Sequence, residues 1–192
     1  GVPGFYIPRA AGPVIFTPAK EDRQLNRLER DNPKTSLNPR VVLYHEYTHH
    51  FMLRNFSAAY PSWYVEGFAE LNSTIDLRPN GSFALGLPAN HRSDELFRMD
   101  QISVRRMLDP ANRIDTMEEA LSKYSLGWLL IHNLTFSKSR NGQLFEYLKA
   151  VGGGENSLVA AERVFGDLGK LNTELNKYKS TNLPAIEVIP PS

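Results

Sequence analysis

The residues best suited to chemistry lie in the pattern His45-Glu46-x-x-His49. In an α-helix, residues four apart lie about 40° from each other around the axis and about 6 Å apart along it, so both imidazoles can reach one metal ion. Glu46 projects beside that ion, where it can take a proton from a water molecule. His50 lies about 140° from His45 and is the weaker ligand candidate. The pattern predicts the metal-binding helix of a zinc hydrolase.

A catalytic zinc ion usually has three protein ligands and a water molecule, so the two histidines require one more residue. The chain has no cysteine, which leaves His, Asp or Glu. Sixteen residues separate His49 from Glu66. This length is enough to finish one helix, turn, and bring a second, antiparallel helix back past the metal. We therefore expect Glu66 to complete a site of two histidines and one glutamate.

The sequence from 43 to 71 resembles the gluzincin clan of zinc metallopeptidases. In that clan HExxH is followed roughly twenty residues later by a glutamate ligand, often within Trp-Leu-x-Glu-Gly-Phe-Ala, and residues 63–69 here read Trp-Tyr-Val-Glu-Gly-Phe-Ala. The stretch looks most similar to little-characterised bacterial peptidase-like families with His-Glu-Tyr-Thr-His, Pro-x-Trp and Glu-Gly-Phe-Ala-Glu elements. The resemblance implies the same three zinc ligands and Glu46 as general base.

Glu70 lies one helical turn after Glu66. In thermolysin-like members of the clan, a carboxylate at this offset binds the other ring nitrogen of a ligand histidine. Such a bond fixes the tautomer and the orientation of the imidazole. Two alternatives remain open, because Glu70 could be a solvated helix residue or could replace Glu66 as the metal ligand.

Gluzincins typically add a Tyr or His donor from a later helix, because the metal alone stabilises the oxyanion of peptide hydrolysis incompletely. Tyr124 is the candidate for this donor. His132 is its competitor, although a lone histidine within an apolar helix is more often a core residue. His91 lies in a polar stretch, where we expect it to be solvated.

The expected reaction is hydrolysis of a peptide or protein substrate by a zinc-activated water, with Glu46 as base. The Gly-x-Met-Glu-Asn element of the aminopeptidase branch is absent before the metal-binding helix, which favours an endopeptidase. The stretch Val14–Thr17 is the candidate edge strand for pairing with an extended substrate. The alternative is a non-catalytic zinc-binding module with a structural or partner-binding role. Glu46 argues against it, since a structural site has no use for a base.

Capping signals place the helices that carry these residues. Asn38 followed by Pro39 predicts an N-cap and the first position of the metal-binding helix. That helix carries apolar residues around most of its circumference, so we expect it to be buried on most sides. Asp115 with Glu118 three residues later resembles a capping box. It opens a long helix whose apolar run at 126–131 predicts core.

The predicted fold class is α+β, a mainly helical, zincin-like domain with a small N-terminal sheet and a short β-hairpin. Two apolar pieces at 4–7 and 13–17 predict the N-terminal strands. Residues 73–78 and 82–87 flank Asn80-Gly81, which is a hairpin signal. The expected helices cover residues 39–56, 63–72, 103–108, 115–136, 143–151, 157–165 and 170–179.

The length of 192 residues suits a single domain over 1–192, alone or as part of a longer protein, with an extended tail at 184–192. The net charge of +1 gives no indication of nucleic acid or of an anionic membrane as a partner. No apolar run approaches the ~20 residues of a membrane span, and the first residues do not read as a signal peptide. Oligomeric state and cellular location stay open, with a preference for the bacterial periplasm or cell envelope.

Overall fold

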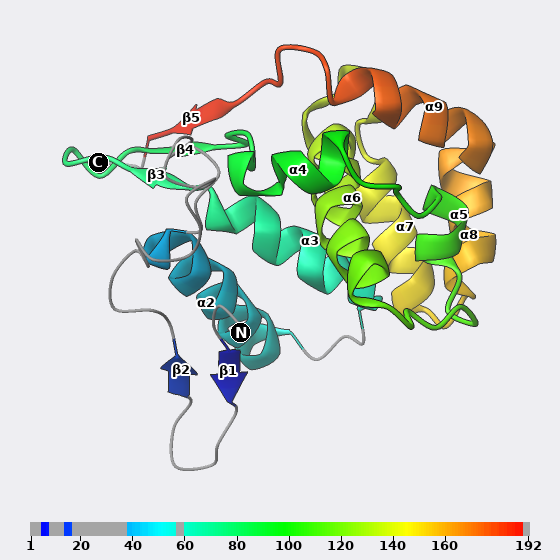
Figure 1. Cartoon of the computed structure of the whole chain (residues 1–192), viewed down its shortest axis with the longest axis horizontal. Coiled ribbons are helices and arrows are strands. Elements are labelled where there is room, and N and C mark those ends of the chain that lie inside the picture. The colour runs from blue at the N-terminus through cyan, green and yellow to red at the C-terminus, as the bar shows by residue number, and fades with distance from the viewer. Residues whose placement is uncertain (1–4, 8–13, 17–37, 57–59, 190–192) are drawn as a thin grey trace.

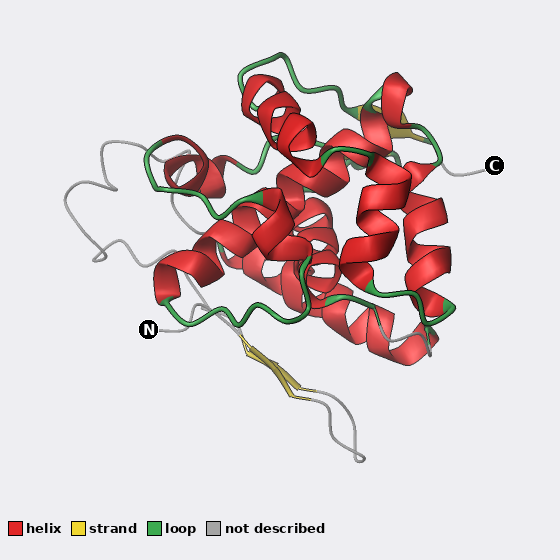
Figure 2. Ribbon diagram, turned by 90° about the vertical axis from the view of Figure 1, so that its right-hand side faces the viewer, coloured by secondary structure: helices red, strands yellow, loops and turns green. Residues whose placement is uncertain are grey.

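The computed structural model describes residues 5–7, 14–16, 38–56 and 60–189. Helices make up most of this part, and the strands form two small antiparallel sheets (Figures 1 and 2). The predicted mainly helical α+β class is confirmed. Among the described helices, none combines the length and the apolar character needed to cross a bilayer.

The His45-Glu46-x-x-His49 pattern lies in the middle of helix α2, Pro39–Asn55. Its start is the predicted one: the Asn38 side chain accepts a hydrogen bond from the Arg40 amide at 2.8 Å, and Pro39 takes the first helical position. Helix α3, Ser62–Ser73, packs against α2 and carries the glutamates. The two expected helices are thus present and in contact.

The surface of α2 differs from the expectation. Val42 and Met52 are buried, but Leu43, Phe51 and Leu53 are exposed. The prediction of a helix buried on most sides is therefore wrong, because within the described structure α3 and the β1–β2 pair cover only part of its circumference.

Helix α6, Met117–Phe136, forms the centre of the core, as predicted from its apolar run. Leu129, Leu130 and Ile131 are at most 1% exposed, and Trp128 is equally buried. The helix packs along α3 and also contacts the shorter helices at 93–97, 104–108, 143–152 and 168–178. The element that carries Glu66 is thereby fixed to the most buried part of the molecule.

The start of α6 shows a capping box displaced by one residue from the predicted pair, Asp115 and Glu118. The N-cap is Thr116, whose hydroxyl accepts a hydrogen bond from the Glu119 amide at 3.1 Å. The Glu119 carboxylate in turn accepts from the Asp115 amide at 3.0 Å. Asp115 and Thr116 are both acceptable caps, so the spacing signal alone could not choose between the two registers.

Helices α3 and α6 touch at two glycines. A Cβ atom added to Gly67 would lie 2.6 Å from both the carbonyl carbon and the carbonyl oxygen of Gly127, which no real contact allows. A Cβ atom added to Gly127 would lie 3.0 Å from the carbonyl oxygen of Trp63. The two backbones therefore pack directly on each other, and this contact sets the position of Glu66.

Replacing Gly67 by alanine is therefore expected to destabilise the protein by about 1–3 kcal/mol, since the added methyl group meets backbone that cannot rotate away. Gly152, the last residue of helix α7 (Gln143–Gly152), is the matched control because its Cβ would meet no atom within 4 Å. Gly152→Ala is expected to leave stability unchanged or slightly raised. Urea unfolding of the three proteins checks this, and equal stability of both variants would contradict the close approach.

Five shorter helices and two 3₁₀ turns make up the rest of the helical structure within the described ranges. The expected helices at 103–108, 143–151, 157–165 and 170–179 are present, with ends shifted by at most two residues, whereas α4 and the turns were not predicted. The bounds are η1 Asn90–Arg92, α4 Ser93–Phe97, α5 Val104–Leu108, η2 Lys138–Arg140, α7 Gln143–Gly152, α8 Ser157–Phe165 and α9 Leu168–Tyr178.

The expected N-terminal strands and the predicted hairpin are both present. Strand β1, Phe5–Ile7, pairs antiparallel with β2, Val14–Phe16, and the pair contacts α2 and projects from the helical body (Figure 2). Strand β3, Asp76–Leu77, pairs antiparallel with β4, Phe83–Leu85. Strand β5, Ile186–Val188, adds to the other side of β4. The tail, expected only to be extended, thus joins the hairpin as a third strand. Its last three residues lie outside the described part.

Candidate metal centre

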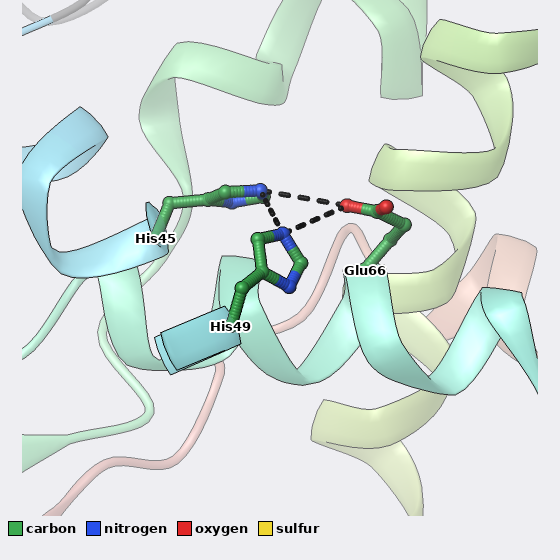
Figure 3. Close-up of side chains that lie close together, drawn as sticks. All are labelled: His45, His49 and Glu66. Carbon is green, nitrogen blue, oxygen red and sulfur yellow. Dashed lines mark hydrogen bonds and ion pairs between the residues drawn. The ribbon is translucent and has the colours of Figure 1, made fainter. Parts of the chain in front are cut away.

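Three side chains from α2 and α3 converge on one point (Figure 3). The Nε2 atoms of His45 and His49 lie 3.0 Å apart. Each lies 3.4 Å from Oε2 of Glu66. The spacing of four residues on α2 brings the imidazoles to one face, and the packing of α3 against α2 places the carboxylate opposite them. The described residues thus contain a His-His-Glu group that could hold a metal ion.

The distances in this group fit a tetrahedral ion. Ligand atoms about 2.1 Å from such an ion lie about 3.4 Å from one another, close to the three separations observed. Oε2 of Glu66 is buried and has no hydrogen-bond partner in the described structure. A buried carboxylate oxygen that makes no hydrogen bond is costly, and either a metal ion or a protonated His45, 3.4 Å away, would compensate its charge. The donor set, two imidazole nitrogens and one carboxylate oxygen, suits a divalent transition metal.

The charges of the group are strongly coupled. Burial by itself would lower the pKa of His45, but its interactions with Glu66 and Glu70 outweigh burial and raise that pKa to about 9. Burial would likewise raise the pKa of Glu66, but the two histidines lower it to about 2. His45 is therefore protonated at neutral pH when it faces only these carboxylates. An ion that binds its Nε2 atom must displace that proton.

Two further site candidates, Glu46 and Tyr124, lie in α2 and α6 respectively. Glu46 follows His45 on α2 and is partly buried. The ring of Tyr124, on α6, lies 6.1 Å from the ring of His45. Burial is the main cause that raises the pKa of the Tyr124 phenol to about 12; the charges of Glu66, Glu70 and Glu46 also raise it, and the charge of Arg92 opposes them. The phenol consequently stays protonated at neutral pH and can donate a hydrogen bond.

Glu70 lies behind His45, away from the converging atoms. It is 1% exposed, and its Oε1 atom lies 3.3 Å from Nδ1 of His45. It also accepts hydrogen bonds from Arg92 and from His91, the latter at 2.8 Å. Burial would raise its pKa, but His45, His91 and Arg92 hold that pKa well below its usual range. The interpretation of Glu70 as a solvated residue is therefore wrong, and its position matches a carboxylate that holds a histidine by the second ring nitrogen.

His91 and Arg92 are the residues near this group that the sequence did not reveal. His91 was expected to be solvated, but its side chain is 6% exposed. Both residues lie in the turn η1, before α4, and pair with a glutamate more than twenty positions earlier. In the sequence, the only indication of this contact was that a His-Arg pair follows Glu70, a helical glutamate to which the sequence assigned no definite partner. That signal is too weak to identify the contact.

The remaining histidines lie outside the group. His132 is fully buried and donates from Nε2 to the carbonyl of Gly86 at 2.9 Å, while its Nδ1 atom lies 2.9 Å from the Tyr178 hydroxyl. Both of its nitrogens are thus engaged in the core, which leaves Tyr124 as the donor candidate near His45. The ring of His50 lies 5.9 Å from the ring of Tyr47.

Comparisons of the chain with protein-family models, with curated proteins and with solved structures found no match. The functional interpretation therefore depends on the geometry of the site and on the local sequence pattern.

Proposed function

We propose that the protein is a zinc-dependent peptidase. The observation that carries the proposal is the convergence of His45, His49 and Glu66 at distances of 3.0 to 3.4 Å, with Glu46 next to the first of them. The resemblance of this stretch to gluzincin metallopeptidases supports the same assignment. A site that only held a metal would have no need of a base beside it.

The three side chains would hold the zinc ion through the two Nε2 atoms and Oε2 of Glu66. Zinc is favoured because two imidazoles and one carboxylate are a donor set that catalytic zinc sites use, and such a set would leave the ion open to a water molecule. When bound, a zinc ion supplies a Lewis acid that polarises a carbonyl and lowers the pKa of a water molecule to about 7.

The other residues act on the proton and on the developing charge. Glu46 accepts the proton of the attacking water and returns it to the leaving amine, so it is both general base and general acid. Tyr124, protonated at neutral pH, donates a hydrogen bond to the oxyanion of the tetrahedral intermediate. Glu70 holds His45 by Nδ1 and keeps Nε2 directed at the ion.

The proposed substrate is a peptide or protein segment in extended conformation, cut internally. Strand β2 is the candidate for pairing with it, because among the described strands it pairs only with β1, and both strands contact α2. Internal cleavage is proposed because residues 1–38 do not contain the Gly-x-Met-Glu-Asn element of the aminopeptidase branch, which favours an endopeptidase.

Metal removal tests the proposal. The purified protein is expected to contain about one zinc ion per chain and to cleave members of a peptide library. Treatment with a chelator should abolish cleavage, and stoichiometric zinc should restore it, since the three ligands remain in place. Elemental analysis and mass spectrometry of the library provide the measurements. A protein that binds zinc but cleaves nothing would instead support the non-catalytic module, in which the same residues only connect α2 and α3.

A further inference from the structure

A buried network connects the back of His45 with Tyr124. Oε1 of Glu70 lies 3.3 Å from Nδ1 of His45 and also accepts a hydrogen bond from Nη2 of Arg92. The guanidinium of Arg92 lies 5.2 Å from the ring centre of Tyr124. One side chain therefore contacts both the carboxylate that holds a histidine of the metal group and the tyrosine beside that histidine.

Arg92 is itself held from a second direction. Its Nη1 atom lies 3.3 Å from Oε1 of Glu95, in helix α4, and its side chain is only 16% exposed. A planar guanidinium can bind two carboxylates in its plane while a ring packs on its face. The compact ammonium of lysine offers no such plane, so this set of contacts is specific to arginine.

We propose that Arg92 is a positioning residue for the metal centre: it fixes Glu70 against His45 and holds the ring of Tyr124 beside it. This inference rests on the proposed zinc site. Because Glu70 uses the same oxygen for Arg92 and for His45, loss of the guanidinium leaves that oxygen free to turn away from the imidazole. Loss of the flat cation also frees the Tyr124 ring.

A substitution of His91 can separate the effect on Glu70 from the effect on Tyr124. It donates to the other oxygen of Glu70, Oε2, at 2.8 Å. Among the described residues, His91 and Tyr124 share no hydrogen bond, ion pair or ring contact, and Glu70 is the partner of His91. His91→Gln is therefore expected to disturb Glu70 and the hold on His45 while leaving Tyr124 in place. Arg98, 79% exposed and paired with Asp94, is a control arginine from the same region.

The experiment measures zinc affinity by competition with a chromogenic chelator and records NMR spectra of the protein with ¹³C-labelled tyrosine rings. Tyr124→Phe assigns the Tyr124 signal. Arg92→Met is expected to weaken zinc binding about 10-fold or more, within the range for outer partners of ligand histidines, and to shift the Tyr124 signal. His91→Gln should weaken zinc binding without shifting the Tyr124 signal. Arg98→Met should change neither the zinc affinity nor the Tyr124 signal.

The outcomes separate this inference from the proposed function. If the native protein binds no zinc, the proposed function fails, whereas the Tyr124 signal still reports on the contact with Arg92. If the native protein binds zinc and Arg92→Met changes neither the zinc affinity nor the Tyr124 signal, the positioning role is overturned. A change in affinity with an unshifted signal overturns the connection to Tyr124. Should Arg92→Met fail to fold by circular dichroism, Arg92→Lys and Glu95→Gln must show the same two changes at smaller size, and unchanged values in both overturn the proposal.

Discussion

Replacing Glu66 by alanine is expected to weaken zinc binding by more than about 100-fold. The change removes one of three converging ligand atoms, and a lost ligand costs more than the 10- to 100-fold typical of an outer partner. The remaining pair of Nε2 atoms, 3.0 Å apart on one helix, leaves the ion with two protein ligands. Titration with zinc in the presence of a competing chelator measures the effect.

Two further variants show whether Glu66 or Glu70 is the metal ligand. Glu70→Ala is expected to weaken binding by only about 10- to 100-fold, because Glu70 contacts Nδ1 of His45 and not the converging atoms. Glu118→Ala, at an exposed position in the first turn of α6, is the matched control and should leave affinity unchanged. If Glu66→Ala binds zinc like the native protein while Glu70→Ala does not, then Glu70 is the ligand and the assignment of Glu66 is wrong.

The second large effect is expected for Glu46→Gln, which should lower peptide cleavage by about 10²- to 10⁴-fold while zinc binding stays unchanged. Glutamine has the shape of glutamate but cannot accept a proton from water, so it removes the general base and keeps the packing. Turnover of the best peptide from the library and the zinc content of the same preparations provide the two measurements.

This pair of measurements discriminates between the candidate functions. Loss of turnover with retained zinc supports Glu46 as the base. Equal cleavage by native protein and variant would show that another group accepts the proton. If both proteins bind zinc and neither cleaves any peptide, the protein is a non-catalytic module. Glu118→Gln, the same substitution at the exposed position, controls for the loss of one carboxylate.

Local signals in the sequence were sufficient for most of the helices. The Asn38-Pro39 start of α2 and the apolar run in α6 are decided by neighbours within a few residues, and both elements were predicted with ends correct to within two residues. Strand β5 could not be predicted in the same way. Its pairing with β4 joins residues about a hundred positions apart, and a three-residue strand leaves no distinct pattern.

The burial of α2 shows a similar limit. Apolar residues around a helix are buried on all sides only if neighbouring elements cover every side. The sequence of the helix itself does not reveal which elements pack against it. In the described structure α3 and the β1–β2 pair leave Leu43, Phe51 and Leu53 exposed. The direct contact of α3 with α6 at Gly67 and Gly127 is likewise visible only when both helices are placed.

For the candidate metal centre, the sequence alone determined that His45 and His49 share a face of α2, with Glu46 next to His45 in the chain, and it nominated Glu66. A spacing of four in a helix dictates this geometry without any tertiary contact. Only the tertiary structure placed Glu66 at 3.4 Å from both imidazoles and gave Glu70 its partners His91 and Arg92. Those distances depend on how α2, α3, η1 and α6 pack together, and packing joins residues that local sequence patterns cannot connect.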